Sequence, residues 1–163
     1  MKQFEGYTYV DGGVCAAKGF KANGVYSGID KAMKAAHEMD LDANGIDGNS
    51  DKNDLGMVVS DAVCNTAAVY TTNKVKGAPI LVTKKNLEKT GGRAKAVIVN
   101  SKNANTCNRD GEQTAAKMCE LTADVLGIDA EEVVVASTGV IGIALPIKPI
   151  EDNIKRLADG LSY

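Results

Sequence analysis

Aromatic side chains and histidine are scarce in this sequence. Its 163 residues include no Trp, two Phe, five Tyr and a single His, His37. With one His, and with no C-x-x-C pair among Cys15, Cys64, Cys107 and Cys119, the sequence contains no zinc motif. Catalysis by a Cys–His pair or a Ser-His-Asp triad is poorly supported as well, because KAMKAAHEMD around His37 is typical of a solvent-facing helix or loop. We interpret the four thiols as reduced and mostly buried apolar residues.

No charge of one sign dominates the sequence, and no long apolar run occurs. The 19 Lys and Arg residues nearly balance 21 Asp and Glu residues, which argues against a nucleic-acid partner. No segment approaches the ~20 apolar residues of a membrane helix, and the first ten residues lack the apolar core of a signal peptide. We therefore expect a cytoplasmic protein with no membrane partner. The length suits one domain, residues 1–163.

Glycine, by contrast, is abundant, with 17 residues. Neither G-x-x-x-x-G-K-[ST] nor G-x-G-x-x-G is present, so no nucleotide-binding loop is predicted and no cofactor is expected.

Hydrophobic periodicity predicts a mixture of strands and helices. The strands are expected at 25–29, 55–59, 67–72, 96–99 and 133–136, with 55–59 and 67–72 forming a hairpin. Helices are expected at 111–126, with a capping box from Asp110 to Gln113 and a left-handed exit at Gly127, and from Pro146 or Pro149 onward. The segment 79–89 fits a helix, although its apolar residues 80–82 also fit a strand. The hairpin and the irregular alternation favour an α+β fold.

The acidic segment 40–53 has the spacing of a calcium loop. In D-L-D-A-N-G-I-D-G-N-S-D, oxygen ligands would come from Asp40, Asp42 and Asn44, with Gly45 at the sharp turn. The twelfth position is Asp51 instead of the bidentate Glu, and a strand is predicted next where a helix would be needed. A solvated surface insertion is therefore favoured, and no metal ligands are assigned.

Two segments that follow predicted strands carry clustered polar groups. In S-T-G-V-I-G (137–142), the Gly139 N–H has no side chain to shield it and the Thr138 hydroxyl adds a second donor, as in an oxyanion hole. In N-S-K-N-A-N-T-C (100–107), three Asn residues could orient a polar substrate or satisfy the loop's own backbone through Asx turns. Taken alone, each segment favours an ordinary turn.

Together, these segments resemble the N-terminal α-chain portion of the ornithine acetyltransferases, the glutamate N-acetyltransferases of arginine biosynthesis. The resemblance covers nearly the whole chain. It departs at Ala17, where Pro is usual, at Lys102, where Gly is usual, and at the atypical segment 40–53. The matching blocks, in order, are GGVCAAKGFKANGVYSGI (12–29), DLGMVVSD (54–61), AAVYTTNKVKGAP (67–79), VNSKNANTC (99–107) and ASTGVIGIALPI (136–147).

The resemblance implies a layered α/β sandwich, as in ornithine acetyltransferases and the related N-terminal-nucleophile aminopeptidases. It implies a precursor that cleaves itself before a Thr, and an α2β2 assembly in which that Thr begins the β chain and acts as nucleophile. The acetyl group would move from N2-acetylornithine to glutamate in a ping-pong cycle. Thr138 and Gly139 match the family's oxyanion hole.

The same resemblance predicts that this chain alone is inactive, because the nucleophilic Thr belongs to the β chain. It leaves the use of acetyl-CoA as a further acetyl donor open. Two alternatives remain: an N-terminal-nucleophile amidase or aminopeptidase, and a non-catalytic calcium-binding domain.

Overall fold

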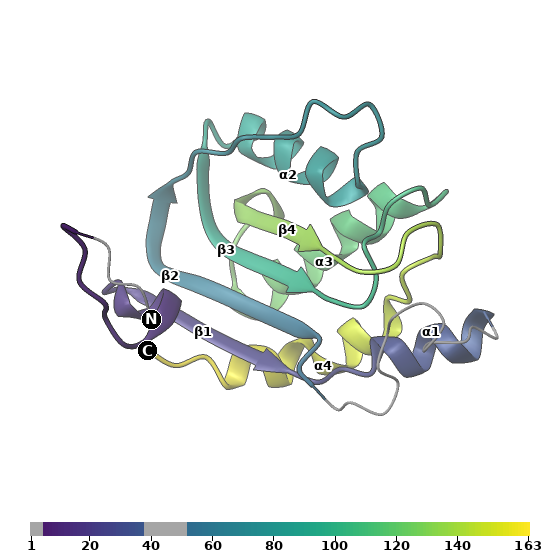
Figure 1. The fold of residues 1–163 in the computed structure, drawn as a ribbon, viewed down its shortest axis with the longest axis horizontal. Helices are drawn as coiled ribbons and strands as arrows, with labels where there is room; N and C mark the ends of the chain where they lie inside the picture. Colours follow the sequence, from purple (N-terminus) through teal and green to yellow (C-terminus); the bar gives the residue numbers. More distant parts are fainter. Residues whose placement is uncertain (1–4, 38–51) are drawn as a thin grey trace.

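A four-stranded mixed sheet forms the centre of the protein (Figure 1). The computed structural model describes residues 5–37 and 52–163. The strands lie in the order β1 (Phe20–Val25), β2 (Leu55–Asn65), β3 (Arg93–Asn100) and β4 (Val133–Ser137). β2 is antiparallel to both β1 and β3, whereas β4 is parallel to β3. The predicted α+β class is confirmed.

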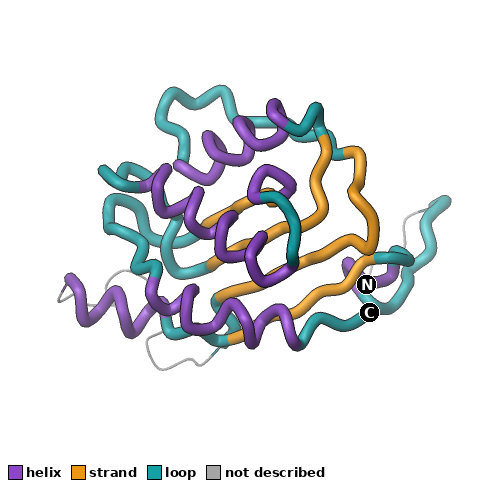
Figure 2. The backbone as a smooth tube through the Cα atoms, turned by 180° about the vertical axis from the view of Figure 1, so that it is seen from behind, coloured by secondary structure: helices purple, strands orange, loops and turns teal. Residues whose placement is uncertain are grey.

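Two helices, α3 (Gly111–Leu126) and α4 (Lys148–Asp159), cover one face of this sheet, and α2 (Ala78–Lys89) lies along its β4 edge (Figure 2). α3 makes the crossover that a parallel β3–β4 pair requires. A fourth helix, α1 (Ile29–His37), contacts α4, and two short 3₁₀ helices, η1 (Gly13–Ala16) and η3 (Ala130–Glu132), precede β1 and β4.

The core lies between the sheet and the three helices. Alternate strand residues point into it, because side chains along a strand alternate between the two faces. Met57, Ile98 and Val135 sit in one row across β2, β3 and β4 and are at most 3% exposed. Met118 of α3 and Ile150 of α4 are fully buried in the same cluster.

The helical predictions were largely confirmed. α3 has the predicted bounds and ends at Gly127 in the left-handed conformation (φ 64°). The ambiguous segment 79–89 is helical, with Pro79 in its first turn, where a missing N–H costs nothing. α4 starts at Lys148 with Pro149 in its first turn, and the predicted strands at 96–99 and 133–136 lie within β3 and β4.

Two strand predictions were wrong. β1 ends at Val25 and α1 starts at Ile29, so 25–29 is not a strand. The hairpin does not form either, since β2 continues to Asn65, pairs with β1 and β3, and 67–72 is an irregular loop in which Val69 is fully exposed. Local apolar composition cannot reveal that β3, later in the chain, is the partner of β2.

Two finer predictions also need correction. Asp110 makes no side-chain capping bond at the start of α3 and contributes only its backbone carbonyl, which accepts from the Thr114 N–H (3.0 Å). The thiols are free, but only Cys119 is buried, and Cys107 is exposed. Most of the acidic segment, including Asp40–Asp51, lies outside the described residues, so its calcium hypothesis stays untested.

Helix α2 covers the edge of the sheet that β4 would otherwise expose. The buried Thr83 hydroxyl donates to the Val135 carbonyl oxygen (2.9 Å) and accepts from the Val135 N–H (3.0 Å). The Asn86 side-chain amide donates to the Val133 carbonyl oxygen (3.0 Å). These bonds satisfy backbone groups that have no strand partner on that side of β4.

Candidate active site

The two polar segments predicted separately lie side by side at the carboxyl ends of β3 and β4. Asn100 and Ser137 are register partners at the last pairing of the two parallel strands. Beyond it, the Val140 N–H donates to the Lys102 carbonyl oxygen (3.0 Å), and the Ala104 N–H donates to the Val140 carbonyl oxygen (2.9 Å). The carboxyl ends of parallel strands are where open α/β sheets usually bind ligands.

Gly139 approaches the neighbouring loop more closely than any side chain would permit. Its φ is +133°, and a Cβ there would lie 2.2 Å from the Lys102 carbonyl carbon and 2.4 Å from the Asn103 nitrogen. Thr138 is fixed next to it by its N–H, which donates to the Asn100 carbonyl oxygen (3.0 Å). Both Thr138 and Gly139 are exposed, so the two residues lie beside each other at the surface. Their catalytic role stays a prediction.

The asparagines of segment 100–107 serve the backbone. Asn103 is fully buried; its Oδ1 accepts from the Asn105 N–H (2.8 Å) and its Nδ2 donates to the Ile143 carbonyl oxygen (3.0 Å). Asn105 Nδ2 donates to the Gly111 carbonyl oxygen (2.9 Å) at the start of α3. Of the two interpretations given to this segment, the self-satisfying loop fits these contacts.

A buried ion pair next to this loop could not be predicted from the sequence. The Lys102 Nζ lies 3.8 Å from Oδ2 of Asp30, which is fully buried in the first turn of α1, and the Lys102 side chain is 13% exposed. The other carboxylate oxygen of Asp30 accepts from the Tyr26 hydroxyl (2.9 Å). Burial, followed by this hydrogen bond to Asp30, raises the pKa of Tyr26. The two partners are far apart in sequence, and no local pattern links them.

Three buried side-chain atoms lack a hydrogen-bond partner among the described residues: Asp30 Oδ2, Asn100 Oδ1 and Ser137 Oγ. Asn100 and Ser137 end β3 and β4, and Asp30 pairs with Lys102, two residues beyond Asn100. Unsatisfied buried polar groups are rare in folded proteins, and each needs an explanation such as a bound water, an ion or a catalytic role. All three lie around the loops that carry Thr138 and Gly139.

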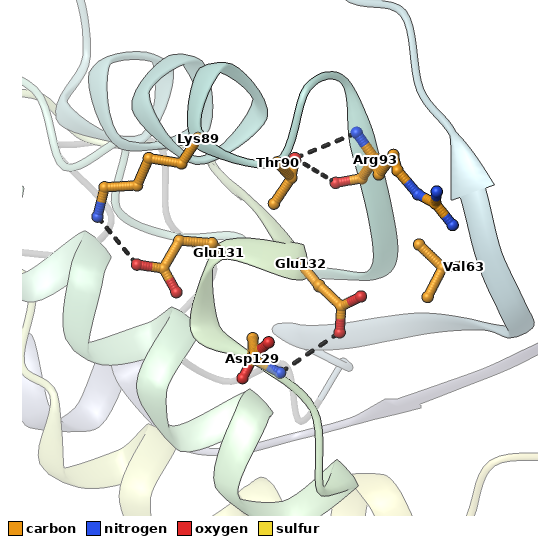
Figure 3. Close-up of a pocket in the computed structure, with 7 residues that line it drawn as sticks. All are labelled: Val63, Lys89, Thr90, Arg93, Asp129, Glu131 and Glu132. Atoms are coloured by element: carbon orange, nitrogen blue, oxygen red, sulfur yellow. Dashed lines mark hydrogen bonds and ion pairs between the residues drawn. The ribbon is translucent and has the colours of Figure 1, made fainter.

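A hollow lies at the other end of the parallel strands, where β3 and β4 begin (Figure 3). Its polar side chains already bind one another. Lys89 Nζ pairs with Glu131 (2.9 Å), a hydrogen bond that lowers the pKa of Glu131, and Thr90 bonds to the backbone of Arg93. This hollow is a weaker candidate than the carboxyl end of the sheet.

The described residues contain neither a membrane-spanning helix nor a cluster of three or more metal-binding side chains.

Comparison with known proteins decides the family. The model of the ArgJ family matches residues 38–162. The chain belongs to the ArgJ family. The expected relationship to the acetyltransferases of arginine biosynthesis is thereby confirmed at the level of the family.

Curated relatives in the ArgJ family are much longer than this chain. The arginine biosynthesis bifunctional protein ArgJ of Gloeobacter violaceus is 40% identical over 160 residues, which are 98% of this chain and 34% of the relative. The protein of the same name from Geobacter sulfurreducens is 47% identical over 110 residues, 66% of this chain and 27% of the relative. The chain thus spans about a third of the length of these ArgJ proteins.

Solved ArgJ structures share the fold. The bifunctional protein ArgJ of Bacillus halodurans aligns with 86% of this chain and 64% of its own, at a TM-score of 0.70 and 35% identity. The ornithine acetyltransferase of Mycobacterium tuberculosis, solved in complex with ornithine, aligns with 90% of this chain and 69% of its own, at a TM-score of 0.72 and 32% identity.

Proposed function

We propose that this chain is the N-terminal, α-chain part of an acetyltransferase of arginine biosynthesis that moves an acetyl group from N2-acetylornithine to glutamate. Membership of the ArgJ family supports the class of reaction. The main structural support for the proposed site is the close contact of Gly139 with Lys102 and Asn103. This contact holds the Thr138–Gly139 pair at the exposed end of β4.

The chemistry needs one nucleophile and two donors. The Oγ of an N-terminal Thr, supplied by the β chain, attacks the acetyl carbonyl carbon, and the carbonyl oxygen becomes negatively charged. The Thr138 hydroxyl and the Gly139 N–H then donate hydrogen bonds to that oxygen. The α-amine of that Thr, or a neighbouring base, takes the hydroxyl proton during the attack and passes it to ornithine, which leaves when the intermediate collapses while the Thr retains the acetyl group. The amine of glutamate attacks this ester in the second half of the cycle and releases the Thr hydroxyl.

Acetyl transfer by the full-length protein tests this function. Transfer from N2-acetylornithine to glutamate should be measurable, and Thr138→Ala should lower turnover by ~10²-fold, as loss of one oxyanion donor does elsewhere. Ser162→Ala, which removes an exposed hydroxyl outside this site, is the matched control and should leave turnover unchanged. Wild-type turnover in Thr138→Ala would remove Thr138 from the site, and acetate release without transfer would indicate the amidase alternative.

The proposed function also requires a partner chain. A β chain from the same precursor, assembled as α2β2, would supply the nucleophile, and residues 1–163 alone would be inactive. Native mass measurement and N-terminal sequencing of the full-length protein test this, with a partner chain that begins with Thr as the expected result. Replacing N2-acetylornithine with acetyl-CoA in the transfer assay decides whether the protein also uses that donor.

A further inference from the structure

We propose that Lys102 and Asp30 form a positioning pair that fixes the orientation of the proposed oxyanion loop, residues 138–140. This inference rests on the proposed function and extends it to two residues outside the predicted site. Lys102 would not contact substrate; its ion pair with Asp30 would hold the peptide against which Gly139 packs.

The burial of the pair distinguishes it from seven exposed ion pairs elsewhere in the described residues. In those pairs, each side chain is at least 35% exposed, whereas Lys102 is 13% exposed and Asp30 fully buried. Exposed pairs contribute little to structure, because water competes for both charges. A buried charge needs its partner, and removing one partner leaves the other uncompensated. The Lys102 ammonium, 3.8 Å from Oδ2 of Asp30, is the charge partner that this buried carboxylate needs.

The backbone of Lys102 is constrained. Its φ is +75°, in the left-handed region that glycine adopts easily and other residues adopt at a cost. Lysine in this conformation requires compensating contacts from the surrounding structure. The ion pair of its side chain with Asp30 and the bond from the Val140 N–H to its carbonyl oxygen (3.0 Å) are such contacts.

Asp30 is itself firmly held. Its Oδ1 accepts from the Tyr26 hydroxyl (2.9 Å) and from the Lys31 N–H (2.8 Å) at the start of α1. Helix α1 also contacts segment 100–107 at a second point, where the Asn103 Nδ2 lies 3.7 Å from the Met33 sulfur. The beginning of α1 therefore acts as a fixed support for the Lys102 side chain.

These contacts form a continuous path from α1 to the proposed oxyanion hole. Asp30 pairs with the Lys102 ammonium, and the Lys102 peptide lies in the space where a Cβ of Gly139 would stand. Rotation of that peptide would displace Gly139 and change the direction of its N–H. Oxyanion stabilisation depends on donors that are already oriented before the reaction, so the pair should affect the rate of the chemical step.

Steady-state kinetics of the full-length protein test the proposal. Lys102→Met removes the charge and should lower kcat by ~10- to 100-fold with little change in KM, because misplaced catalytic groups cost rate without weakening ground-state binding. Lys102→Arg retains the charge and should recover most of kcat. Lys155→Met removes an exposed lysine that pairs with Asp159 and should behave as wild type. If Lys102→Met fails to fold, the charge-neutral Lys102→Met/Asp30→Asn variant replaces it and should show the same loss of kcat.

A double-mutant cycle with Thr138→Ala separates positioning from general destabilisation. If Lys102 acts through the oxyanion hole, its substitution should have almost no further effect once the hole is impaired. An equal fold-loss in both backgrounds, or wild-type kcat in the charge-neutral variant, would overturn the positioning role while leaving the proposed function intact. No acetyl transfer by the wild-type protein would overturn both.

Discussion

Asp54 illustrates, at the scale of one residue, how a buried carboxylate can organise backbone. It is 2% exposed and accepts hydrogen bonds from the N–H groups of Ser27 (2.6 Å), Gly28 (3.1 Å) and Ile29 (3.0 Å). The first N–H groups of a helix have no partner within it, and a negative charge there is favourable. Asp54, the residue before β2, thus caps α1 from a distant part of the sequence.

Replacing Asp54 should loosen the start of α1. Asp54→Ala removes charged hydrogen bonds worth ~1.5–3 kcal/mol each, so amides in residues 26–37 should exchange with solvent at least ~10-fold faster. Hydrogen–deuterium exchange of the full-length protein measures this. Asp61→Ala, at a half-exposed carboxylate that pairs with Lys21, should leave the exchange of α1 unchanged. Equal protection of residues 26–37 in wild type and Asp54→Ala would show that Asp54 does not cap the helix.

The buried thiol of Cys119 should be inert in the native protein. Burial raises its pKa to about 12 from an ordinary value of 9.0, because the thiolate is poorly solvated there. The folded state therefore keeps the proton between pH 9 and about 12 while the unfolded state loses it, so this thiol favours unfolding as pH rises through that range. At pH 8 to 9, iodoacetamide should modify Cys119 only after denaturation, as peptide mass spectrometry would show. Labelling at equal rates in native and denatured protein would contradict its burial.

The role of a single residue could be predicted only where a short sequence motif indicates it. The role of Thr138 and Gly139 stays a prediction that rests on the family resemblance of the S-T-G-V-I-G block, because the local pattern alone favours an ordinary turn. The partners of Asp30 and Asp54 depend on tertiary contacts, and local sequence patterns contain no information about those contacts.

At the scale of elements, helix α2 supplies the hydrogen bonds that the edge strand β4 lacks on one side. Its Thr83 hydroxyl bonds to both backbone groups of Val135 on the edge strand β4. Thr83→Val keeps the shape of the side chain but leaves a buried N–H and a buried carbonyl without a partner. Each such group costs ~1–3 kcal/mol.

We therefore expect Thr83→Val to lower the free energy of unfolding of this region by about 2–4 kcal/mol. Thr83→Ser retains the hydroxyl and should lose less, which separates the hydrogen bonds from the packing of the methyl group. Urea denaturation of the full-length protein, followed by hydrogen exchange of β4, provides the measurement. Equal stability of the Val and Ser variants would rule out these bonds as a major contribution.

Elements were predictable where periodicity is long, and strand pairing was not. α3 has apolar positions over 16 residues and a glycine after its last turn, and its bounds were predicted correctly. The run 67–72 has the composition of a strand, yet the place beside β2 belongs to β3, whose residues 93–100 form a longer pairing. Competition between segments for one partner depends on the whole fold, so local composition predicted the wrong pairing.

At the scale of the whole molecule, the sheet has an apolar face without helices. Val58, Val97 and Val134 form one row across β2, β3 and β4, on the face opposite Met57 and Ile98. They are only half-buried, and none of the α-helices of the described residues lies over this face, which is turned to the viewer in Figure 1. Sheets that are apolar on both faces are normally covered on both. The layered sandwich expected for this family would place a second layer here, from the two thirds of the relatives' length that this chain does not span.

Val97→Asp in the full-length protein tests whether this face is an internal surface. If a second layer packs on Val97, the substitution buries an unpaired carboxylate and should cost more than ~3 kcal/mol, seen as a lower thermal midpoint and as aggregation in size-exclusion chromatography. Val69→Asp introduces the same charge at a fully exposed valine of the 66–77 loop and should change neither property. If neither variant changes these properties, the face is solvated in the complete protein, and the sheet is buried only on the side of its helices. If only Val97→Asp is damaging, the half-buried valines belong to a core that this chain completes only together with the rest of the protein.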